Sequence, residues 1–318
     1  MTDAPLSAPP SLFCFGLGYT ALAVARRVMP LGWTVAGTTT DPGKLQALKA
    51  AGIAAELFSS ARPLADARAS LMNVTHILLS IPPCTDGDTT FDLHSDDIAN
   101  APTLRWLGYL STTGVYGNRN GDWVDENSTP APTSRRGDHR LRAEEQWRGL
   151  HVMTGVPLHT FRLSGIYGPG RSAIDSLRAG QARRINKQGH VFNRIHVEDI
   201  ATTLIASMQS PRAGAIYNLA DDLPSSSADV ISYAAKLIDM PEPPLIDADK
   251  VDMAPMVRSF YKDNKRIRND LIKTELGVEL RYSDYRLGLA DCLAAEDAPD
   301  TDPRDAALRD LMLASLPG

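Results

Sequence analysis

Short apolar runs separated by longer mixed segments recur along the first half of the chain. Residues 12–15 form one such run, and apolar residues then recur at Leu22, Ala25, Val28 and Met29, the spacing of one helix face. Further strands are expected at 33–38, 53–58, 75–81, 104–111 and 157–163, with helices at 42–51, 64–72 and 138–153. Strands alternating with helices in this way indicate crossover connections and a parallel sheet. The pattern predicts a doubly wound α/β fold.

The first strand runs into a glycine turn. Gly16 and Gly18 follow it one residue apart, and Ala21 comes three residues later, before the helical pattern. Gly16 would make the tight turn, Gly18 would let the backbone approach phosphates, and Ala21 would let the helix pack closely on the strand. This order is typical of the Rossmann dinucleotide site, where a pyrophosphate sits on a helix N-terminus. The motif alone is weak evidence, and its place on the first strand strengthens it.

The alternation breaks into shorter pieces after residue 165. We expect a basic helix at 173–184, a strand at 215–219, a helix at 227–237 and a last amphipathic helix at 304–316. The predicted domains are a loose tail at 1–11, a Rossmann dinucleotide-binding core at 12–165 and a mixed region at 166–295. The mixed region would complete the sheet and form a smaller C-terminal α/β substrate domain. An acidic linker and the last helix would occupy 296–318.

The composition of the chain limits the partners and the cellular location that we expect. The 318 residues are 43% hydrophobic and 22% charged, with a net charge of −5 and no basic run, so we expect no nucleic-acid partner. No apolar run reaches the ~20 residues of a membrane span, and the proline-rich start does not resemble a signal peptide. The three scattered cysteines fit a reducing cytoplasm and show no metal-binding spacing with histidine. We therefore expect a cytoplasmic protein without a membrane or metal partner.

Five motifs in register resemble the extended short-chain dehydrogenase/reductases, the NAD-dependent epimerase/dehydratase family. They are the glycine turn, S-T-T-G-V-Y-G at 111–117, R-L-S-G-I-Y-G-P-G at 162–170, I-H-V-E-D-I-A at 195–201 and Y-N-L-A-D-D at 217–222. The similarity covers roughly residues 12–290 and is greatest to an atypical branch, the YeeZ-like proteins. The resemblance implies a nicotinamide cofactor and a small-molecule substrate.

In this family, chemistry rests on a Ser or Thr four residues before the tyrosine of V-Y-G and on a Y-x-x-x-K pair in the next helix. Thr112 fills the first role, whereas alignment on the A-E pair at 143–144 puts Arg136 and Arg140 at the tyrosine and lysine positions. Arginine stays protonated, so Arg136 cannot act as an acid or base, while Arg140 can still help to bind the cofactor. Tyr116 and Tyr167 are alternative proton donors by residue type, and the favoured interpretation for both is that they pack the turn with the hydroxyl on the backbone.

Cofactor choice depends on the end of the second strand. An acid about 20 residues past the glycine turn would bind the 2′-hydroxyl of NAD. The run at 37–40 is G-T-T-T and holds no carboxylate, which favours NADP, with NAD as the alternative. Asp41 precedes Pro42 and is better explained as a helix N-cap, and only Lys44 brings positive charge nearby. The predicted cofactor-binding residues are Gly16, Leu17, Gly18, Tyr19, Thr20, Thr38, Thr39, Thr40, Ser80, Ile81 and Pro82.

The resemblance also implies a substrate side. Arg171 and Arg194 flank two of the motifs, so an anionic substrate group competes with the default interpretation of a solvated basic face. His196 lies in a third motif, where a buried structural role and a catalytic role carry equal weight. The predicted substrate-binding residues are Tyr167, Arg171, Arg194 and His196.

One Y-x-x-x-K does occur, at Tyr261 and Lys265, but it lies beyond the expected Rossmann core and reads as coincidence.

Two function classes remain open from the sequence. The first is an NADP-dependent oxidoreductase or epimerase acting on a hydroxyl- or carbonyl-bearing substrate, with Thr112 polarising an oxygen. The second is a non-catalytic dinucleotide-binding protein, a redox sensor or scaffold. Loss of both the tyrosine and the lysine favours the second class, and retention of Thr112 with the substrate-side motifs favours the first. A homodimer is compatible with either.

Overall fold

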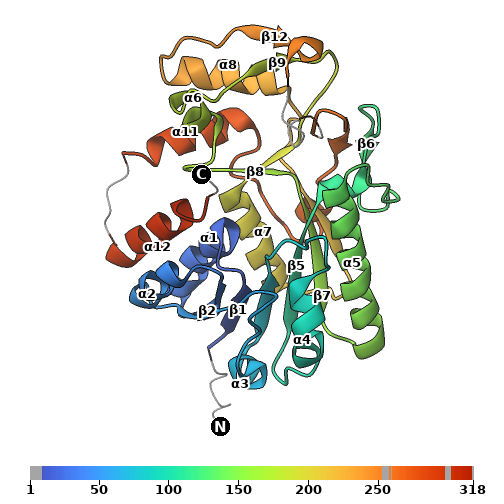
Figure 1. Cartoon of the computed structure of the whole chain (residues 1–318), viewed down its shortest axis with the longest axis vertical. Helices are drawn as coiled ribbons and strands as arrows, with labels where there is room; N and C mark the ends of the chain where they lie inside the picture. Colours follow the sequence, from blue (N-terminus) through green and yellow to red (C-terminus); the bar gives the residue numbers. More distant parts are fainter. Residues whose placement is uncertain (1–8, 253–257, 259, 298–301, 317–318) are drawn as a thin grey trace.

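A sheet of seven parallel strands lies at the centre of the computed structural model, which describes residues 9–252, 258, 260–297 and 302–316. The strand order is β11-β7-β5-β4-β1-β2-β3 (Figure 1). This order reverses beside β1 and confirms the doubly wound, Rossmann-type α/β fold. The strands are β1 (Ser11–Phe15), β2 (Thr34–Thr39), β3 (Ala54–Leu57), β4 (His76–Leu79), β5 (Trp106–Thr112), β7 (Leu158–Leu163) and β11 (Ile216–Leu219).

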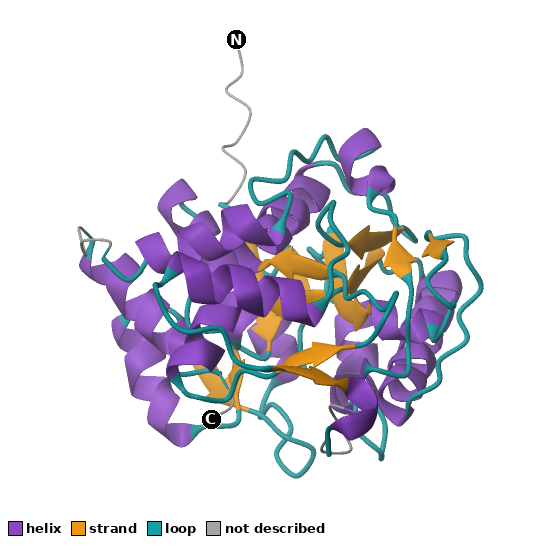
Figure 2. Ribbon diagram, turned by 90° about the horizontal axis from the view of Figure 1, so that it is seen from above, coloured by secondary structure: helices purple, strands orange, loops and turns teal. Residues whose placement is uncertain are grey.

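Helices cover both faces of the sheet, so strands lie between helical layers in Figure 2. One face packs against α1 (Tyr19–Val28), α2 (Pro42–Ala50) and α7 (Val197–Gln209). The other packs against α3 (Ala67–Leu71), α4 (Thr89–Ala99) and α5 (Arg135–Thr154). Because both faces are buried, the central strands are apolar on both sides, as the continuous apolar runs in the sequence predict.

A second group of elements lies beyond the carboxyl edge of the sheet, in the upper part of Figure 1. Its helices α6 (Ala173–Arg178), α8 (Ser227–Leu237) and α11 (Tyr285–Ala294) share an apolar core that includes Tyr167 and Ile231. Three two-stranded parallel sheets accompany them: β8 (Gly165–Tyr167) with β10 (Arg194–His196), β9 (Arg184–Asn186) with β12 (Leu245–Asp247), and β6 (Trp123–Val124) with β13 (Arg266–Ile267). Other short elements are η1 (Met29–Leu31), η2 (Thr113–Tyr116), η3 (Ala248–Lys250) and α10 (Asp270–Thr274).

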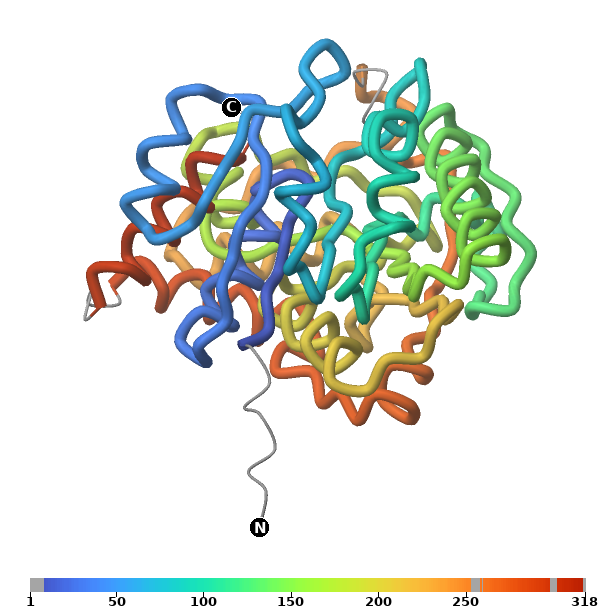
Figure 3. Tube along the Cα trace, turned by 90° about the horizontal axis from the view of Figure 1, so that it is seen from below, coloured from blue at the N-terminus to red at the C-terminus, as the bar shows by residue number. Residues whose placement is uncertain are grey.

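The last helix returns to the first. α12 (Pro303–Leu313) packs on α1 and α2, and its residues Leu308, Leu311 and Met312 belong to the same core cluster as α1. Figure 3 shows this red segment beside the blue N-terminal elements. The two ends of the chain are therefore joined through one hydrophobic core.

Several expected elements differ from the structure at their ends. The basic helix expected at 173–184 is wrong beyond Arg178, because the chain turns at Gly180, whose φ is +65°, and Arg184 begins β9. The helix expected at 64–72 is shorter, since Asp66 caps α3 by accepting from the Ala69 amide. α5 begins three residues early, and α4 has no counterpart among the expected elements.

The predicted tail and linker are only partly described. β1 begins at Ser11, the last residue of the expected tail, and residues 1–8 lie outside the described residues. The same is true of 298–301 in the expected linker. Among the described residues, no helix is long and apolar enough to cross a membrane.

Buried histidines are a feature of the interior. Burial lowers the pKa of each of four imidazoles from its ordinary 6.5 to about 4, so each is neutral at pH 7. These are His76, His159, His190 and His196. Neither ring nitrogen of His159 or His190 has a hydrogen-bond partner among the described residues.

Candidate dinucleotide and substrate site

The glycine turn after β1 is tied to the two neighbouring strands. Gly16 has φ +92°, and a Cβ there would lie 2.9 Å from Ile81 Cγ1 and 3.0 Å from Ser80 Oγ, so glycine is required. Its amide donates to Thr38 Oγ1 at 2.9 Å, and its carbonyl accepts from the Ser80 hydroxyl at 2.6 Å. Predicted cofactor residues from β1, β2 and β4 thus meet at one point of the carboxyl edge.

The N-cap of α1, Gly18, has open space beside it. Gly18 is the N-cap with φ −98°, it supplies no side-chain cap, and nothing lies within 4 Å of the place a Cβ would occupy. The first turn contains no acidic residue. Helix-start N–H groups and the positive end of the helix dipole would therefore meet an anion there without a competing carboxylate. These residues fit a dinucleotide pyrophosphate.

The end of β2 carries hydroxyls with different partners. The Thr38 side chain is buried and holds the glycine turn, so it is not free for a ligand. Thr39 Oγ1 accepts from the Asp41 amide at 3.1 Å, whereas Thr40 is exposed. Asp41 caps α2 by accepting from the Gly43 amide at 2.8 Å, which confirms the N-cap prediction.

Thr112 ends β5 and caps η2. Its Oγ1 accepts from the Gly114 amide at 3.1 Å, which leaves the hydroxyl proton available to a substrate oxygen. Tyr116, at the other end of η2, is fully buried, and its hydroxyl donates to Asn218 Oδ1 at 2.8 Å. Burial raises the pKa of the Tyr116 phenol. These contacts favour the packing interpretation for Tyr116 over proton donation.

A buried polar network lies beneath this turn. Arg162 on β7 donates from Nη1 to the Tyr116 hydroxyl at 2.9 Å and from Nη2 to Glu144 Oε2 at 2.7 Å. Glu144, on α5, also accepts from Arg162 Nε at 3.1 Å and from the Ser111 hydroxyl. The network therefore fixes the carboxyl end of β5, next to Thr112, against α5.

The two arginines at the family's tyrosine and lysine positions have different surroundings. Arg140 donates to the Leu110 carbonyl, and its guanidinium carbon lies 5.8 Å from the Tyr109 ring centroid, so it is held against β5. Arg136 is exposed. Burial lowers the pKa of Arg171, and the charge of Arg136 lowers it further. The Arg171 guanidinium carbon lies 5.9 Å from the ring centroid of Tyr19, so this cation lies near the start of α1.

A pocket of about 670 Å³ opens in the second group of elements. Tyr167, Arg171 and Arg194 line it, which brings three of the four predicted substrate residues together. Arg194 donates from Nη1 to the Phe192 and Ser225 carbonyls, both at 3.2 Å. Burial lowers the pKa of Arg194. The pocket is thus lined by three arginines, Arg171, Arg183 and Arg194.

A carboxyl group lies close to the charge of Arg194. Burial raises the pKa of Asp221 to about 8, and Arg194 opposes this shift. Among the described residues, Asp221 Oδ2 has no hydrogen-bond partner.

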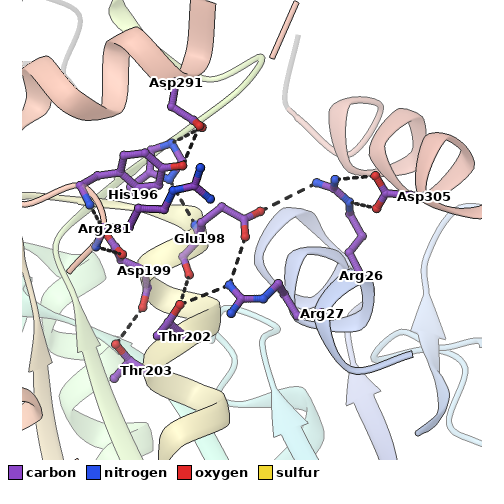
Figure 4. A network of polar contacts seen from close by, with 11 residues as sticks. Arg26, Arg27, His196, Glu198, Asp199, Thr202, Thr203, Arg281, Asp291 and Asp305 are labelled. Carbon is purple, nitrogen blue, oxygen red and sulfur yellow. Dashed lines mark hydrogen bonds and ion pairs between the residues drawn. The ribbon is translucent and has the colours of Figure 1, made fainter. Parts of the chain in front are cut away.

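His196, the fourth predicted substrate residue, is not among the pocket-lining residues. It is fully buried, its Nδ1 accepts from the Glu198 amide at 3.3 Å, and its Nε2 lies 3.7 Å from Asp291 (Figure 4). Asp199 accepts from the Arg281 and Tyr282 amides at 2.8 and 3.0 Å. This motif caps α7 and ties it to a distant loop, as the structural interpretation expects.

The sequence does not indicate that Tyr261 and Lys265 lie beside the pocket and the V-Y-G turn. Tyr261 lines the pocket, and the Lys265 ammonium donates to the Gly117 carbonyl at 2.8 Å, at the end of the V-Y-G turn. Lys265 follows Gly117 by 148 positions, so no local pattern could have placed it there.

Comparisons with known proteins agree with this architecture. No known family profile matches the sequence. Protein YeeZ of Escherichia coli K12 is 28% identical over 279 residues, which cover 85% of this chain and 95% of YeeZ. A solved protein of unknown function from Silicibacter pomeroyi is 48% identical, with a TM-score of 0.84 over 90% of this chain and 99% of its own.

An enzyme structure shows the same fold at lower identity. The NAD complex of dTDP-glucose 4,6-dehydratase from Bacillus anthracis is 16% identical, with a TM-score of 0.75, and the match covers 92% of this chain and 98% of the enzyme. With the five motifs and the strand order, the likeness to YeeZ supports an extended short-chain dehydrogenase/reductase-like protein of the YeeZ-like branch.

Proposed function

We propose that this protein binds NADP at the start of α1 and acts as an oxidoreductase or epimerase on a small anionic substrate that bears a hydroxyl or carbonyl group. The observation that carries the proposal is the α1 N-terminus, which has no side-chain cap and faces open space at Gly18. A helix start of this kind at the carboxyl edge of a parallel sheet, beside the strand-order reversal, is suited to a pyrophosphate.

Different residues around this helix start would bind different parts of the cofactor. The amides after Gly18 would take the pyrophosphate, and the end of β2 would take the adenosine ribose. The absence of a carboxylate at 37–40 favours a 2′-phosphate over a free 2′-hydroxyl. When bound, the nicotinamide supplies or accepts a hydride, which is chemistry that no side chain provides.

The pocket supports a substrate with an anionic group. Its volume of about 670 Å³ is that of a small-molecule site, and Arg171 and Arg194 bring positive charge to its wall. The charge of Arg136 lowers the pKa of Arg171, and neither guanidinium group takes part in an ion pair among the described residues. A phosphate or carboxylate placed between them would relieve their repulsion.

Thr112 is the residue that we assign to the reacting oxygen. Its hydroxyl accepts from Gly114, so its proton can be donated to a substrate carbonyl or alkoxide. Arg136 stays charged and cannot exchange a proton, and the Tyr116 hydroxyl is engaged in the core. If the protein is an enzyme, its proton therefore comes from a group other than these two.

A non-catalytic dinucleotide-binding protein is the second candidate. It is favoured by the arginines that replace the tyrosine and the lysine, and by the burial of Tyr116. Such a protein would bind NADP and respond to its redox state without turnover.

A single substitution tests the binding proposal. Gly18→Asp places a carboxylate at the α1 N-cap, where φ is −98° and space is open, so the fold should tolerate it or gain stability. We expect calorimetric titration to show NADPH binding to the natural chain and at least about 100-fold weaker binding to the variant, since two like charges would meet. No binding of NADPH or NADH to the folded natural chain would refute the proposal.

A substrate screen then separates the two classes. Aldehydes, ketones and nucleotide sugars would be incubated with NADPH and the protein, and the NADPH absorbance followed. Turnover with any of them supports the enzyme. Tight NADPH binding with no turnover across the screen supports the sensor.

A further inference from the structure

Arg194, on β10, is fixed on the wall of the pocket. Its Nη1 donates to the Phe192 and Ser225 carbonyls, both at 3.2 Å, and its guanidinium carbon lies 5.9 Å from the Phe192 ring centroid. In the part of the chain that the structure describes, its Nε and Nη2 donate no hydrogen bond. These two nitrogens form one edge of the guanidinium, and this edge remains available to a ligand.

The charge of Arg194 is not neutralised by an ion pair. None of the ion pairs among the described residues includes Arg194, and burial lowers the pKa of its guanidinium. Asp221 is the carboxyl group whose charge acts on it most, but burial raises the pKa of Asp221 to about 8, so this carboxyl is largely protonated at pH 7. A cation taken out of water without a counter-ion carries a desolvation cost, which a bound anion offsets. The wall therefore favours an anion at Arg194.

The pocket wall includes part of the apolar core of the second group of elements. The buried residues that belong both to that core and to the wall are Tyr167, Val230, Ile231, Tyr285 and Leu289. The rings of Phe192 and Tyr261 extend this wall and contact each other edge to face, with their centroids 5.0 Å apart. A ligand body that covers these groups would remove apolar surface from water, which stabilises the complex.

Three neutral polar side chains of the wall are already engaged within the fold. The Ser172 hydroxyl caps α6, and the Ser176 hydroxyl donates to the Ser172 carbonyl at 3.1 Å. The Asn193 side-chain amide donates to the Lys265 carbonyl and accepts from the Ile267 amide, both at 2.9 Å. A ligand with a row of hydroxyls would give up hydrogen bonds to water and find few partners here, which costs free energy. The wall thus suits a ligand body with few polar groups.

We propose that the pocket binds a carboxylate with an apolar, aromatic or branched-chain body, and that Arg194 holds the carboxylate through Nε and Nη2. The two oxygens of a carboxylate match the two N–H groups on this edge of the guanidinium. A nucleotide sugar is the contrasting occupant, because its hydroxyls would meet the apolar wall. This inference rests on the proposed function and adds the chemical class of its substrate.

Binding to the natural chain tests the inference without any need for turnover. The probes are phenylacetate, indoleacetate and isocaproate, each compared with its own primary amide, and UDP-glucose and inorganic phosphate are the other occupants to be compared. Calorimetric titration should show at least one acid with a Kd of about 1 mM or below. Its amide should bind at least about 10-fold more weakly, because a neutral amide makes no charge-assisted hydrogen bond to the guanidinium. UDP-glucose and phosphate should also bind more weakly than this acid.

Matched substitutions place the ligand at the two parts of the wall. Arg194→Met should weaken binding of the acid by about 10- to 100-fold, and Arg194→Lys, which keeps the charge and loses the paired N–H groups, by about 3- to 10-fold. Arg178→Met is the control, since Arg178 is an exposed arginine of α6 outside the wall. Val230→Thr puts a hydroxyl on the wall at nearly constant volume and should weaken the acid by about 5-fold, whereas Val152→Thr, at an exposed position, should change its affinity less than about twofold.

Several results would overturn the inference. These are equal affinities of every acid and its amide, equal losses in Arg194→Met and Arg178→Met, or tighter binding of UDP-glucose or phosphate than of every acid. If Arg194→Met does not fold, unchanged binding of the acid by Arg194→Lys is the result that would overturn it.

The same titrations separate this inference from the proposed function. Binding of an acid that depends on Arg194, in a chain that binds neither NADPH nor NADH, would refute the proposed function and leave the carboxylate site in place. Binding of NADPH without binding of any acid would overturn the carboxylate site and leave the cofactor proposal intact.

Discussion

Replacing Glu144 by glutamine would leave the guanidinium of Arg162 buried without its counter-charge. Both side chains are almost completely buried, with 7% and 4% of their surfaces exposed. Arg162 donates to Glu144 from Nε at 3.1 Å and from Nη2 at 2.7 Å. The carboxylate is therefore the anion that compensates this cation in the interior.

The expected cost follows from these contacts. Breaking a buried ion pair by removing one partner costs about 3–5 kcal/mol, because the remaining charge is uncompensated. A glutamine can still accept one hydrogen bond through its carbonyl oxygen, so we expect Glu144→Gln to lower the free energy of unfolding by about 3 kcal/mol. Arg162→Met should cost a similar amount. The double variant should cost less than the sum, with a coupling of about 2 kcal/mol, because neither charge is then left alone.

Urea unfolding followed by tryptophan fluorescence measures these values, and Trp147 lies on the same helix as Glu144. Glu145→Gln is the control, since Glu145 is the next residue and is exposed, and we expect a change within about 0.5 kcal/mol. Losses below about 1 kcal/mol in both single variants, or additive losses in the double variant, would show that the pair is not a compensating unit.

Three other outcomes can be checked with the same protein. Between pH 6.5 and 4 the four histidines bind protons in the unfolded chain but stay neutral in the folded one, so the free energy of unfolding should fall on acidification by up to about 3 kcal/mol per histidine. The raised pKa of Asp221 acts in the opposite direction and cancels part of this fall. A urea midpoint that does not change over this range would contradict the burial of these histidines. Thr112→Ala should reduce any turnover found in the substrate screen by about 10- to 100-fold while NADPH affinity, measured by titration, changes less than about twofold. Gly37→Ala should lower the free energy of unfolding, measured by heat or urea, by about 3 kcal/mol because its Cβ would collide with the Cys14 carbonyl. Gly149→Ala, on an open helix surface, should raise it by about 0.5–1 kcal/mol. Equal effects of the two substitutions would refute the packing argument.

Much of the core could be predicted because its signals are local. A buried strand followed at once by Gly16 and Gly18 specifies a strand, a turn and a helix within a few residues. The Asp41-Pro42 pair likewise marks a helix start that the structure confirms. The parallel sheet followed from the alternation of short apolar runs with expected helices, whereas the strand order came from the structure.

The parts that could not be predicted depend on distant contacts. The Tyr116 hydroxyl is fixed by Arg162 and Asn218, which lie 46 and 102 positions away. α4 carries polar residues on much of its surface and so lacked the apolar periodicity of a helix. Ser315 accepts a hydrogen bond from Lys44, which lies 271 positions earlier, and no pattern in the sequence indicates this contact.

The contact between the first and last helices has a consequence for synthesis on the ribosome. Most of α1 is buried, and Arg26 finds its carboxylate partner Asp305 only 279 positions later. At translation rates of roughly 5–20 residues per second, α1 waits for tens of seconds before α12 can cover it. α1 is thus synthesised long before the helix that covers it, and during that interval the surface that α12 will cover is accessible to chaperones.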